Sequence, residues 1–349
     1  MKMKSVYCYM LAGLMLSASS CSSWLSEDDA PVMSYDYYET EAGVNAAITA
    51  AYGFVRWGVG GERFDVLTEL GTDLFTEGED GSNRESYNKY ATQLNPDDGI
   101  LYEMWENHYK GISDANIAMQ KIRDSQDLLE SVKIQSYAEM QFIRAYLYFD
   151  LVQQFGRIPL VTEGSFEIRT DFKRAPIADV YNVIISDLRN AAENLPEKAS
   201  VLGRATRYSA AHLLAKVYLT RGSAVKDARG QKATDMDSTL YYAEQVINSG
   251  AYALQENFSS LWDIKNQGNS EAVFAVQFTT EPMFNGDGNK QHLYWLSWYE
   301  DQPGMLRDIE NGRPYRRHVA TKKTMDDLFD RLHDSRFYKS FKWVTMQIM

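Results

Sequence analysis

The sequence has very little cysteine. Its 349 residues include only Cys8 and Cys21. Cys8 lies inside an apolar run over residues 6–16, which is too short to span a bilayer and is typical of a secretory signal. We therefore expect Cys8 to leave with a signal segment over residues 1–20, which excludes a fold held together by disulfide bonds.

The sequence also lacks the usual signatures of catalysis. Its five histidines show no HExxH or other metal-binding spacing, and neither a GxxxxGK phosphate loop nor a nucleophile elbow is present. Asp73 and the acidic turn over residues 77–81 could gather oxygen ligands around Ca²⁺, but they lack the ordered spacing of an EF-hand. A solvated acidic turn is the favoured interpretation, and the sequence predicts neither an enzyme nor a bound cofactor.

Positive charge is scarce as well. The formal net charge is −12, a balance that disfavours nucleic acid as a partner because phosphates bind lysine and arginine. Aromatic residues, in contrast, make up 13% of the chain, with 23 Tyr and 7 Trp. A helical core alone needs fewer, and surfaces that bind sugars or peptides use such rings. Part of the aromatic excess is therefore expected at the surface.

The N-terminus predicts attachment to a membrane. Lys2 and Lys4 precede the apolar run, and small residues at 17–20 precede Cys21. This order resembles a bacterial lipoprotein signal, in which Cys21 becomes the lipidated first residue. The acidic cluster within the following tether, residues 21–35, resembles the signal that sends some lipoproteins to the outer face of the outer membrane. An ordinary signal peptide and a merely solvated tether are the alternatives.

The rest of the chain, residues 36–349, is predicted to be one mainly α-helical domain. Apolar residues recur at three- and four-residue steps, and glycine or proline follows several of these segments. Paired helices of this kind are typical of tetratricopeptide-like stacking. The predicted helices cover residues 38–57, 101–122, 136–155, 177–195, 209–220 and 240–249.

Residues 136–163 are the most informative stretch. They begin as a helix that is apolar on nearly every side and must therefore be buried. The helix should end at Gly156, which can adopt a left-handed conformation, and Pro159 favours an extended exit. Arg144 is the one basic residue in the apolar run, so it needs a buried partner or a route to water.

Only one convincing strand is predicted, over residues 271–278. Two long polar and aromatic loops, over residues 71–96 and 279–317, separate the helices. Loops of this length are usually functional or disordered. They are where a binding site is expected. Trp105 and Tyr109, in contrast, have helical spacing and are expected in the core.

Together these segments resemble the SusD/RagB family of outer-membrane lipoproteins. The resemblance covers nearly the whole chain and follows the same order as in the family. The matching segments are Trp24-Leu25-Ser26, TEAGVNAA (40–47), WENHYKGI (105–112), residues 138–161, GRAT (203–206), AEQVINSG (243–250) and EAVF (271–274). Family members usually extend well past Met349, so a truncated gene or a fragment is expected.

The resemblance implies a tetratricopeptide-like scaffold with a loop-rich region and few short strands. It also implies a non-catalytic function. Family members bind oligosaccharides, or peptides in some branches, at the cell surface, and they sit on a TonB-dependent outer-membrane transporter of the SusC type. A helical adaptor that binds only the transporter is a further alternative.

Candidate ligand-binding residues come from the two long loops. A sugar ring stacks on an aromatic face, and its hydroxyls hydrogen-bond to amide, guanidinium and carboxylate groups. The assignment is positional because the family's loops vary. Packing of the loop aromatics against one another is an equally good interpretation of Trp295 and Trp298. The candidates are Asn83, Arg84, Tyr87, Tyr90, Trp295, Trp298 and Tyr299.

Overall fold

The structure is a computed structural model. It describes residues 37, 39–80, 84–91, 94–165, 169–225, 229–281, 283, 286, 288–307 and 312–340. The proposed signal and tether, with Cys21, and the candidate site residue Asn83 lie outside the described residues.

Most of the described chain is helical. The helical elements, in chain order, are α2 (Glu41–Val55), η2 (Arg56–Gly58), α3 (Glu62–Thr68), α4 (Glu85–Lys89), α5 (Gly99–Asp124), α6 (Glu130–Phe155), α7 (Ile177–Asn194), α8 (Arg207–Gly222), α9 (Asp235–Ile247), α10 (Phe258–Leu261), η3 (Ile264–Asn266), α12 (Gln291–Tyr294), η4 (Tyr299–Asp301), η5 (Lys323–Asp327) and α13 (Arg336–Ser340). Every helix predicted from the sequence is present.

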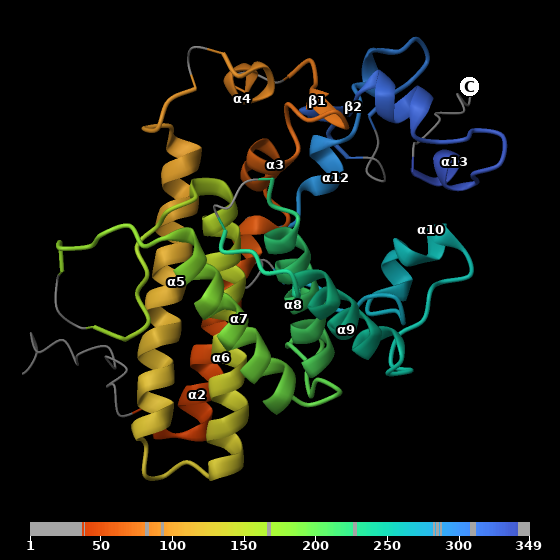
Figure 1. Cartoon of the computed structure of the whole chain (residues 1–349). Helices are drawn as coiled ribbons and strands as arrows, with labels where there is room; N and C mark the ends of the chain where they lie inside the picture. Colours follow the sequence, from red (N-terminus) through yellow and green to blue (C-terminus); the bar gives the residue numbers. More distant parts are fainter. Residues whose placement is uncertain are drawn as a thin grey trace, which may run out of the picture.

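The long helices form one stack. From α5 to α9, each helix packs mainly against its neighbour in the chain, α5 on α6, α6 on α7, α7 on α8 and α8 on α9, and α2 packs against both α5 and α6. Figure 1 shows α2, α5 and α6 side by side at one end of the stack and α9 at the other. This arrangement confirms the predicted tetratricopeptide-like scaffold. Its core is one continuous cluster of buried side chains.

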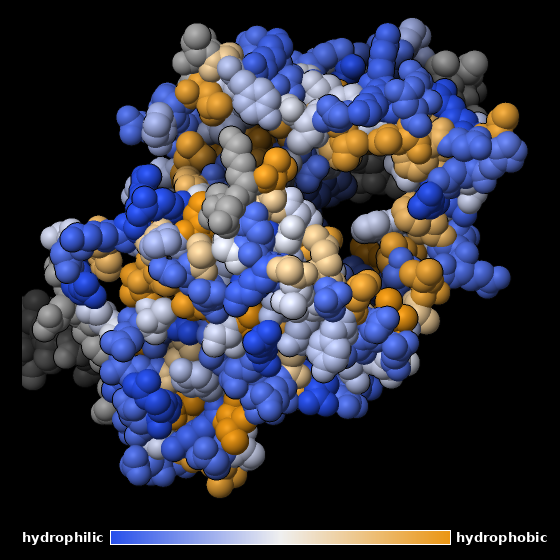
Figure 2. Space-filling model, in the orientation of Figure 1, coloured by the Kyte–Doolittle hydropathy of each residue, from blue (hydrophilic) through white to orange (hydrophobic). Residues whose placement is uncertain are grey.

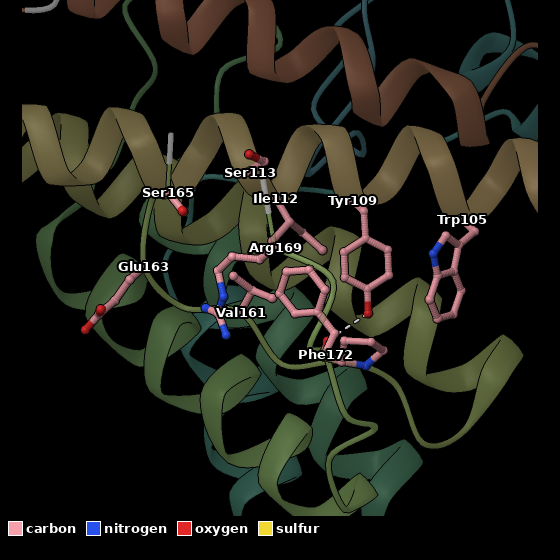
Figure 3. Close-up of a pocket in the computed structure, with 10 residues that line it drawn as sticks. Trp105, Tyr109, Ile112, Ser113, Val161, Glu163, Ser165, Arg169 and Phe172 are labelled. Atoms are coloured by element: carbon pink, nitrogen blue, oxygen red, sulfur yellow. Dashed lines mark hydrogen bonds between the residues drawn. The ribbon is translucent and has the colours of Figure 1, made fainter. Parts of the chain in front are cut away.

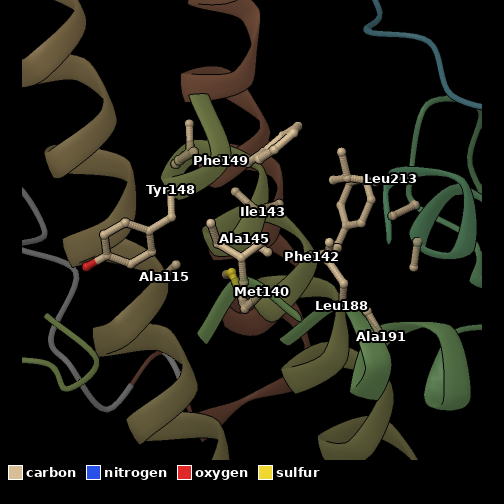
Figure 4. Close-up of a cluster of buried hydrophobic side chains, with 14 of the residues drawn as sticks. Ala115, Met140, Phe142, Ile143, Ala145, Tyr148, Phe149, Leu188, Ala191 and Leu213 are labelled. Carbon is tan, nitrogen blue, oxygen red and sulfur yellow. The ribbon is translucent and has the colours of Figure 1, made fainter. Parts of the chain in front are cut away.

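Helix α6 lies at the centre of this core (Figure 4). Phe142 meets Phe274 edge to face with ring centroids 5.2 Å apart, and Phe149 meets Tyr181 in the same way at 6.4 Å. The helix ends at Gly156, which has a φ of +67°. The predictions of a buried helix and of a glycine stop are both confirmed.

The buried Arg144 has the partners that its position requires. Its Nε and Nη2 each donate to a carboxylate oxygen of Asp187 at 2.8 Å, and its Nη1 donates to Asn116 Oδ1 at 2.7 Å and to the Thr162 carbonyl at 3.0 Å. Gln141 Nε2 adds a donor to Asp187 at 2.9 Å. The network ties α5, α6 and α7 together within the core.

The predicted strand over residues 271–278 is wrong. This segment has no strand partner among the described residues, so its backbone completes no ladder. Its apolar side chains instead pack on the helices: Phe274 contacts Phe142 and also lies 6.4 Å from the ring of Tyr52. The apolar, β-branched composition reflects burial against helices rather than membership of a sheet.

The sheet lies elsewhere and joins the two long loops. Strand β1 (Phe75–Glu77) pairs antiparallel with β2 (His318–Ala320), with Phe75 opposite Ala320 and Glu77 opposite His318. Figure 1 shows this pair with α3, α4 and α12 at the upper end of the helical stack. We call the part formed by α3, α4, α12, β1 and β2 the loop module. It brings the ends of the two predicted functional loops together.

The surface is mostly hydrophilic on the face drawn in Figure 2. A hollow opens on the right of that view, beside α10 and the C-terminal segment, and hydrophobic side chains border it. Several apolar residues of this part are strongly exposed, among them Trp262 and Ile264. Among the described helices, none is long and apolar enough to cross a membrane.

Candidate ligand-binding site

A polar cleft of about 740 Å³ lies where the loop module meets the scaffold. Its walls come from the C-terminal end of α2, from η2, from the turn before α3, from α5 and from five described residues between 278 and 294. Its described lining residues are Gly53, Arg56, Trp57, Val59, Gly60, Gly61, Glu62, Arg63, Arg84, Glu103, Asn107, Phe278, Gly286, Gly288, Lys290, Tyr294 and Arg317. Its volume is within the range of small-ligand pockets.

Two consecutive glycines shape one wall of the cleft. Gly60 has a φ of +93°, and a Cβ there would lie 2.6 Å from the ring of Phe278. The Gly60 carbonyl accepts from the Lys290 backbone N–H at 2.9 Å, and the Gly61 carbonyl accepts from Gln291 Nε2 at 3.0 Å. The absence of side chains at Gly60 and Gly61 therefore lets the second loop dock directly on the turn between η2 and α3.

A buried carboxylate organises the charged side of the cleft. Glu62, only 6% exposed, accepts from Arg84 Nε at 3.0 Å and from Arg84 Nη2 at 3.3 Å, and it also accepts from Arg317 Nη1. Burial acts to raise the pKa of Glu62, but hydrogen bonds and charge from the two arginines outweigh it and hold the pKa below its usual value. Glu62 is thus ionised and clamped between two guanidinium groups.

Aromatic rings lie beside two guanidinium groups of the cleft, those of Arg317 and Arg56. The Arg317 guanidinium lies 5.6 Å from the Tyr294 ring centroid and 5.1 Å from that of Tyr315, and the Arg56 guanidinium lies 4.6 Å from that of Phe278. Both sides of the cleft therefore present guanidinium planes beside aromatic faces.

The predicted site residues occupy different places in the loop module. Arg84 lines the cleft. Tyr87 is buried beside α3, and Tyr90 is exposed at the end of α4, where its hydroxyl donates to the Gly71 carbonyl at 3.3 Å. Burial, then the Asp98 carboxylate, raises the pKa of Tyr87 well above its usual value, so its phenol stays neutral.

The second set of candidates makes contacts outside the cleft. Trp295 is half-buried; its indole N–H donates to Gln291 Oε1 at 2.9 Å, and its ring meets Phe75 edge to face at 4.7 Å. Tyr299 is buried and donates to the Gly312 carbonyl at 2.8 Å, while Trp298 is half-buried. None of these three lines the cleft, although the adjacent Tyr294 does.

Several cleft residues were not among the sequence candidates. Glu62, Arg63 and Arg317 lie outside any recognised motif, and Trp57 was assigned to the end of a helix. The one local signal is the run GVGGER over residues 58–63, in which flexible glycines directly precede two charges. That run indicates a turn, but it does not indicate what the turn contacts.

A buried histidine and a half-buried aspartate lie close together within the loop module. His318 is fully buried, with its Nε2 3.7 Å from Asp65 Oδ2 and its ring 5.0 Å from that of Trp295. Burial lowers the pKa of His318 to about 4 and raises the pKa of Asp65 to about 6. Both shifts favour the neutral forms of the two groups.

The two shifts give opposite dependences of stability on pH. Between pH 6.5 and 4 the unfolded chain protonates its histidine first, so acid destabilises the fold through His318. In nearly the same range the folded chain takes up a proton at Asp65 that the unfolded chain does not, so acid stabilises the fold through Asp65. The two contributions to the change of stability with pH therefore largely cancel.

Replacing Asp65 with asparagine should leave only the pH dependence of stability that arises from His318. Above pH 6 the variant avoids the cost of a buried carboxylate, so we expect it to be more stable than the wild type by on the order of 2 kcal/mol, with this gain disappearing toward about pH 4. Urea unfolding across this pH range measures it. Asp73→Asn, at an exposed ion pair with Lys323, is the control and should leave the profile between pH 5 and 7 unchanged. A constant difference between Asp65→Asn and wild type would contradict the assignment.

A second concavity lies on the side of the scaffold (Figure 3). This groove of about 530 Å³ runs between α5 and the segment after α6. Tyr109 donates its hydroxyl to the Pro159 carbonyl at 2.7 Å, and its ring lies 4.8 Å from that of Trp105. Both rings pack against the core, as expected, but they are half-buried and also line the groove beside Phe172.

The acidic turn over residues 77–81 does not gather its carboxylates. Glu77 lies 3.5 Å from Lys89, Glu79 pairs with Arg316 at 2.5 Å, and Asp73 pairs with Lys323. Across the described part of the chain, no group of three or more His, Cys, Asp or Glu is placed to hold a metal ion. Asp73, Glu77 and Glu79 thus each pair with a cation.

Comparison with known proteins shows which family this chain resembles. A SusD-like family model, described as "Starch-binding associating with outer membrane", matches residues 32–219. A SusD-like protein of Formosa agariphila is 27% identical over 341 residues, covering 89% of this chain and 63% of that protein.

Solved structures agree with this match. A laminarin-binding SusD-like protein has a TM-score of 0.57 at 28% identity, covering 67% of this chain and 50% of that one. A SusD superfamily protein of Parabacteroides distasonis shares the fold with a TM-score of 0.67 at 23% identity, covering 84% and 61%. The chain spans less than two thirds of the length of these relatives. The family model alone matches more than half of the chain, and the chain belongs to the SusD-like family.

Proposed function

We propose that this protein binds an oligosaccharide or polysaccharide at the cell surface, without catalysis, in the cleft beside Glu62. The observation that carries the proposal is the composition of this cleft. The rings of Trp57 and Phe278 line it together with guanidinium, carboxylate and amide groups. Family membership supports it, as does the laminarin binding named for one relative.

The chemistry of the cleft suits a sugar. A pyranose presents a C–H face that packs on an aromatic ring, and the half-buried Phe278 and Trp57 offer such rings. Sugar hydroxyls both donate and accept, so they can bridge Arg84, Glu62 and Asn107. The Nδ2 of Asn107 donates to the Phe54 carbonyl at 2.9 Å, which fixes the orientation of its amide. Because the clamp on Glu62 is rigid, little side-chain ordering is needed on binding.

The proposed cellular setting follows from the sequence. Removal of residues 1–20, lipidation of Cys21 and a tether over residues 21–35 would anchor the domain to the outer membrane, facing the cell exterior. There the protein would deliver its glycan to a TonB-dependent transporter of the SusC type. The family's described association with the outer membrane supports this setting.

Phe278→Ala should weaken glycan binding about 3- to 10-fold, because one stacking face contributes roughly 0.5–1.5 kcal/mol. Affinity electrophoresis and calorimetry on the purified protein, with a panel of polysaccharides that includes laminarin, measure the change. Trp262→Ala is the matched control because Trp262 is 73% exposed and does not line the cleft.

The same panel decides between alternative sites and ligands. If the double change Trp295→Ala/Trp298→Ala abolishes binding while Phe278→Ala leaves it intact, the site lies on the second loop rather than in the cleft. Binding of peptides but no glycan would assign the protein to the peptide-binding branch. Detectable sugar release would contradict the non-catalytic function.

A further inference from the structure

The cleft is basic on a strongly acidic protein. The chain carries a formal charge of −12. The described residues that line the cleft nevertheless include five basic side chains, Arg56, Arg63, Arg84, Lys290 and Arg317, and two carboxylates, Glu62 and Glu103. The local sign of charge is therefore opposite to that of the whole chain.

The excess of positive charge in the cleft is clearest around Glu62, where two guanidinium groups share one carboxylate. One positive charge of this triad is uncompensated within it. The triad is only partly open to solvent, since the Arg84 and Arg317 side chains are 13% and 27% exposed. A charge in such a place is screened less by salt than one on the open surface.

The geometry of the cations suits an oxyanion. Arg317 is stacked on two tyrosine rings, so its guanidinium plane is fixed before any ligand arrives. A guanidinium group donates two parallel hydrogen bonds to a carboxylate or a sulfate, and such bonds are stronger than those to a neutral hydroxyl. A neutral sugar gains little from an uncompensated positive charge.

The groove on α5 offers a contrast within the same molecule. Its lining holds one basic side chain, Arg169, and one acidic side chain, Glu163, and Arg169 also pairs with Asp171 at 3.1 Å. No positive excess arises there. The cleft and this groove therefore differ in the balance of charge along their walls.

We propose that the cleft selects acidic glycans, whose carboxylate or sulfate groups bind at the Arg84–Glu62–Arg317 triad. This inference rests on the proposed function, because it names the ligand class of the same site. Arg84 and Arg317 would meet the anionic group, and Arg63, held by Glu103 at 3.0 Å, lies at the more exposed side of the cleft.

The main test compares two polymers that share a backbone and differ in charge, polygalacturonate and its methyl ester, each titrated into the purified protein. Carrageenan, a sulfated galactan, and laminarin, a neutral glucan, are titrated as further acidic and neutral probes. We expect an acidic polymer to bind at least about tenfold more tightly than its neutral counterpart, and this preference to shrink between about 0.02 M and about 0.2 M salt. Carboxylate and sulfate sources are distinguished by which acidic polymer binds.

The outcomes separate this inference from the proposed function. Binding of laminarin or of the methyl ester with equal or higher affinity would overturn the acidic preference and leave glycan binding intact. Binding of no polysaccharide at all would overturn both.

A charge variant tests the same preference. It is expected to strengthen binding, whereas damage to the structure would weaken it. Glu103→Gln removes a carboxylate from the cleft and leaves Arg63 uncompensated, so affinity for the acidic polymer should rise about 2- to 5-fold. Glu106→Gln is the matched control: it lies on the same helix, pairs with Lys110 at 3.0 Å and has nearly the same exposure, 42% against 43%, but does not line the cleft. Unchanged or weaker binding by Glu103→Gln would contradict the proposal.

Discussion

Replacing Arg144 with alanine is expected to destabilise the protein by about 3–5 kcal/mol, because it leaves a buried carboxylate without its charged partner. Asp187 is only 3% exposed at its side chain and accepts from Arg144 at 2.8 Å. Burial raises the pKa of Asp187 even with the arginine present, so the ionised form depends on that contact. Urea unfolding followed by circular dichroism measures the loss.

A second variant separates the lost charge partner from lost packing. Arg144→Met/Asp187→Leu removes both charges and keeps apolar volume, so it should recover most of the stability that Arg144→Ala loses. Arg123→Ala, at an exposed pair with Asp124, should change the free energy of unfolding by less than about 0.5 kcal/mol. A similarly small loss for Arg144→Ala would show that the network contributes little.

Gly111→Ala is expected to destabilise the protein by about 1–3 kcal/mol through overpacking. Gly111 lies inside α5, where α2 and α6 both approach. A Cβ at this position would be 2.6 Å from Leu147 Cδ1 and 2.9 Å from Phe54 Cβ. Relief requires these helices to separate or both neighbours to change rotamer. Thermal and urea unfolding of the variant measure the cost.

Gly53→Ala is the matched control with the opposite expected sign. Gly53 also lies inside a long helix, α2, but no heavy atom outside its immediate neighbours comes within 4 Å of a Cβ built there. The substitution should stabilise the protein by about 0.5–1 kcal/mol, the usual helical preference for alanine over glycine. Equal effects of the two substitutions would contradict the close approach at Gly111.

The helical scaffold could be predicted because its signals are local. A side chain's face on a helix depends only on its spacing, so apolar steps of three and four residues predicted α5 and α7 closely. The stop at Gly156 and the need for a partner at Arg144 follow from single residues in the same way. The identity of that partner does not, because Asp187 is 43 residues away.

The strand prediction failed for a related reason. A strand exists only when a second segment completes its hydrogen bonds, and composition alone does not reveal the partner. Residues 271–278 pack against helices instead, whereas the less apolar Phe75–Glu77 pairs with the strand His318–Ala320. The decisive contact joins segments more than 240 residues apart.

The cleft, too, was predicted only as far as local sequence signals allow. The sequence predicts a site on two long loops, and of its candidate residues Arg84 lines the cleft. It did not indicate that Arg84 and Arg317 meet on Glu62, since Arg317 and Glu62 are 255 residues apart. The aromatic candidates Trp295 and Tyr299 satisfied the composition of a sugar site, but Trp295 packs on Phe75 of the loop module, Tyr299 is buried, and neither lines the cleft.

By itself, the sequence determined the helical scaffold, its buried central helix, its family resemblance and the segments in which a site should be sought. These rest on periodicity and on the conformational limits of single residues, which act over a few positions of the chain. The tertiary structure decided which charges meet, which rings are buried and where the cleft opens. Those properties depend on contacts between distant segments, and they exist only after the scaffold has brought the two loops together.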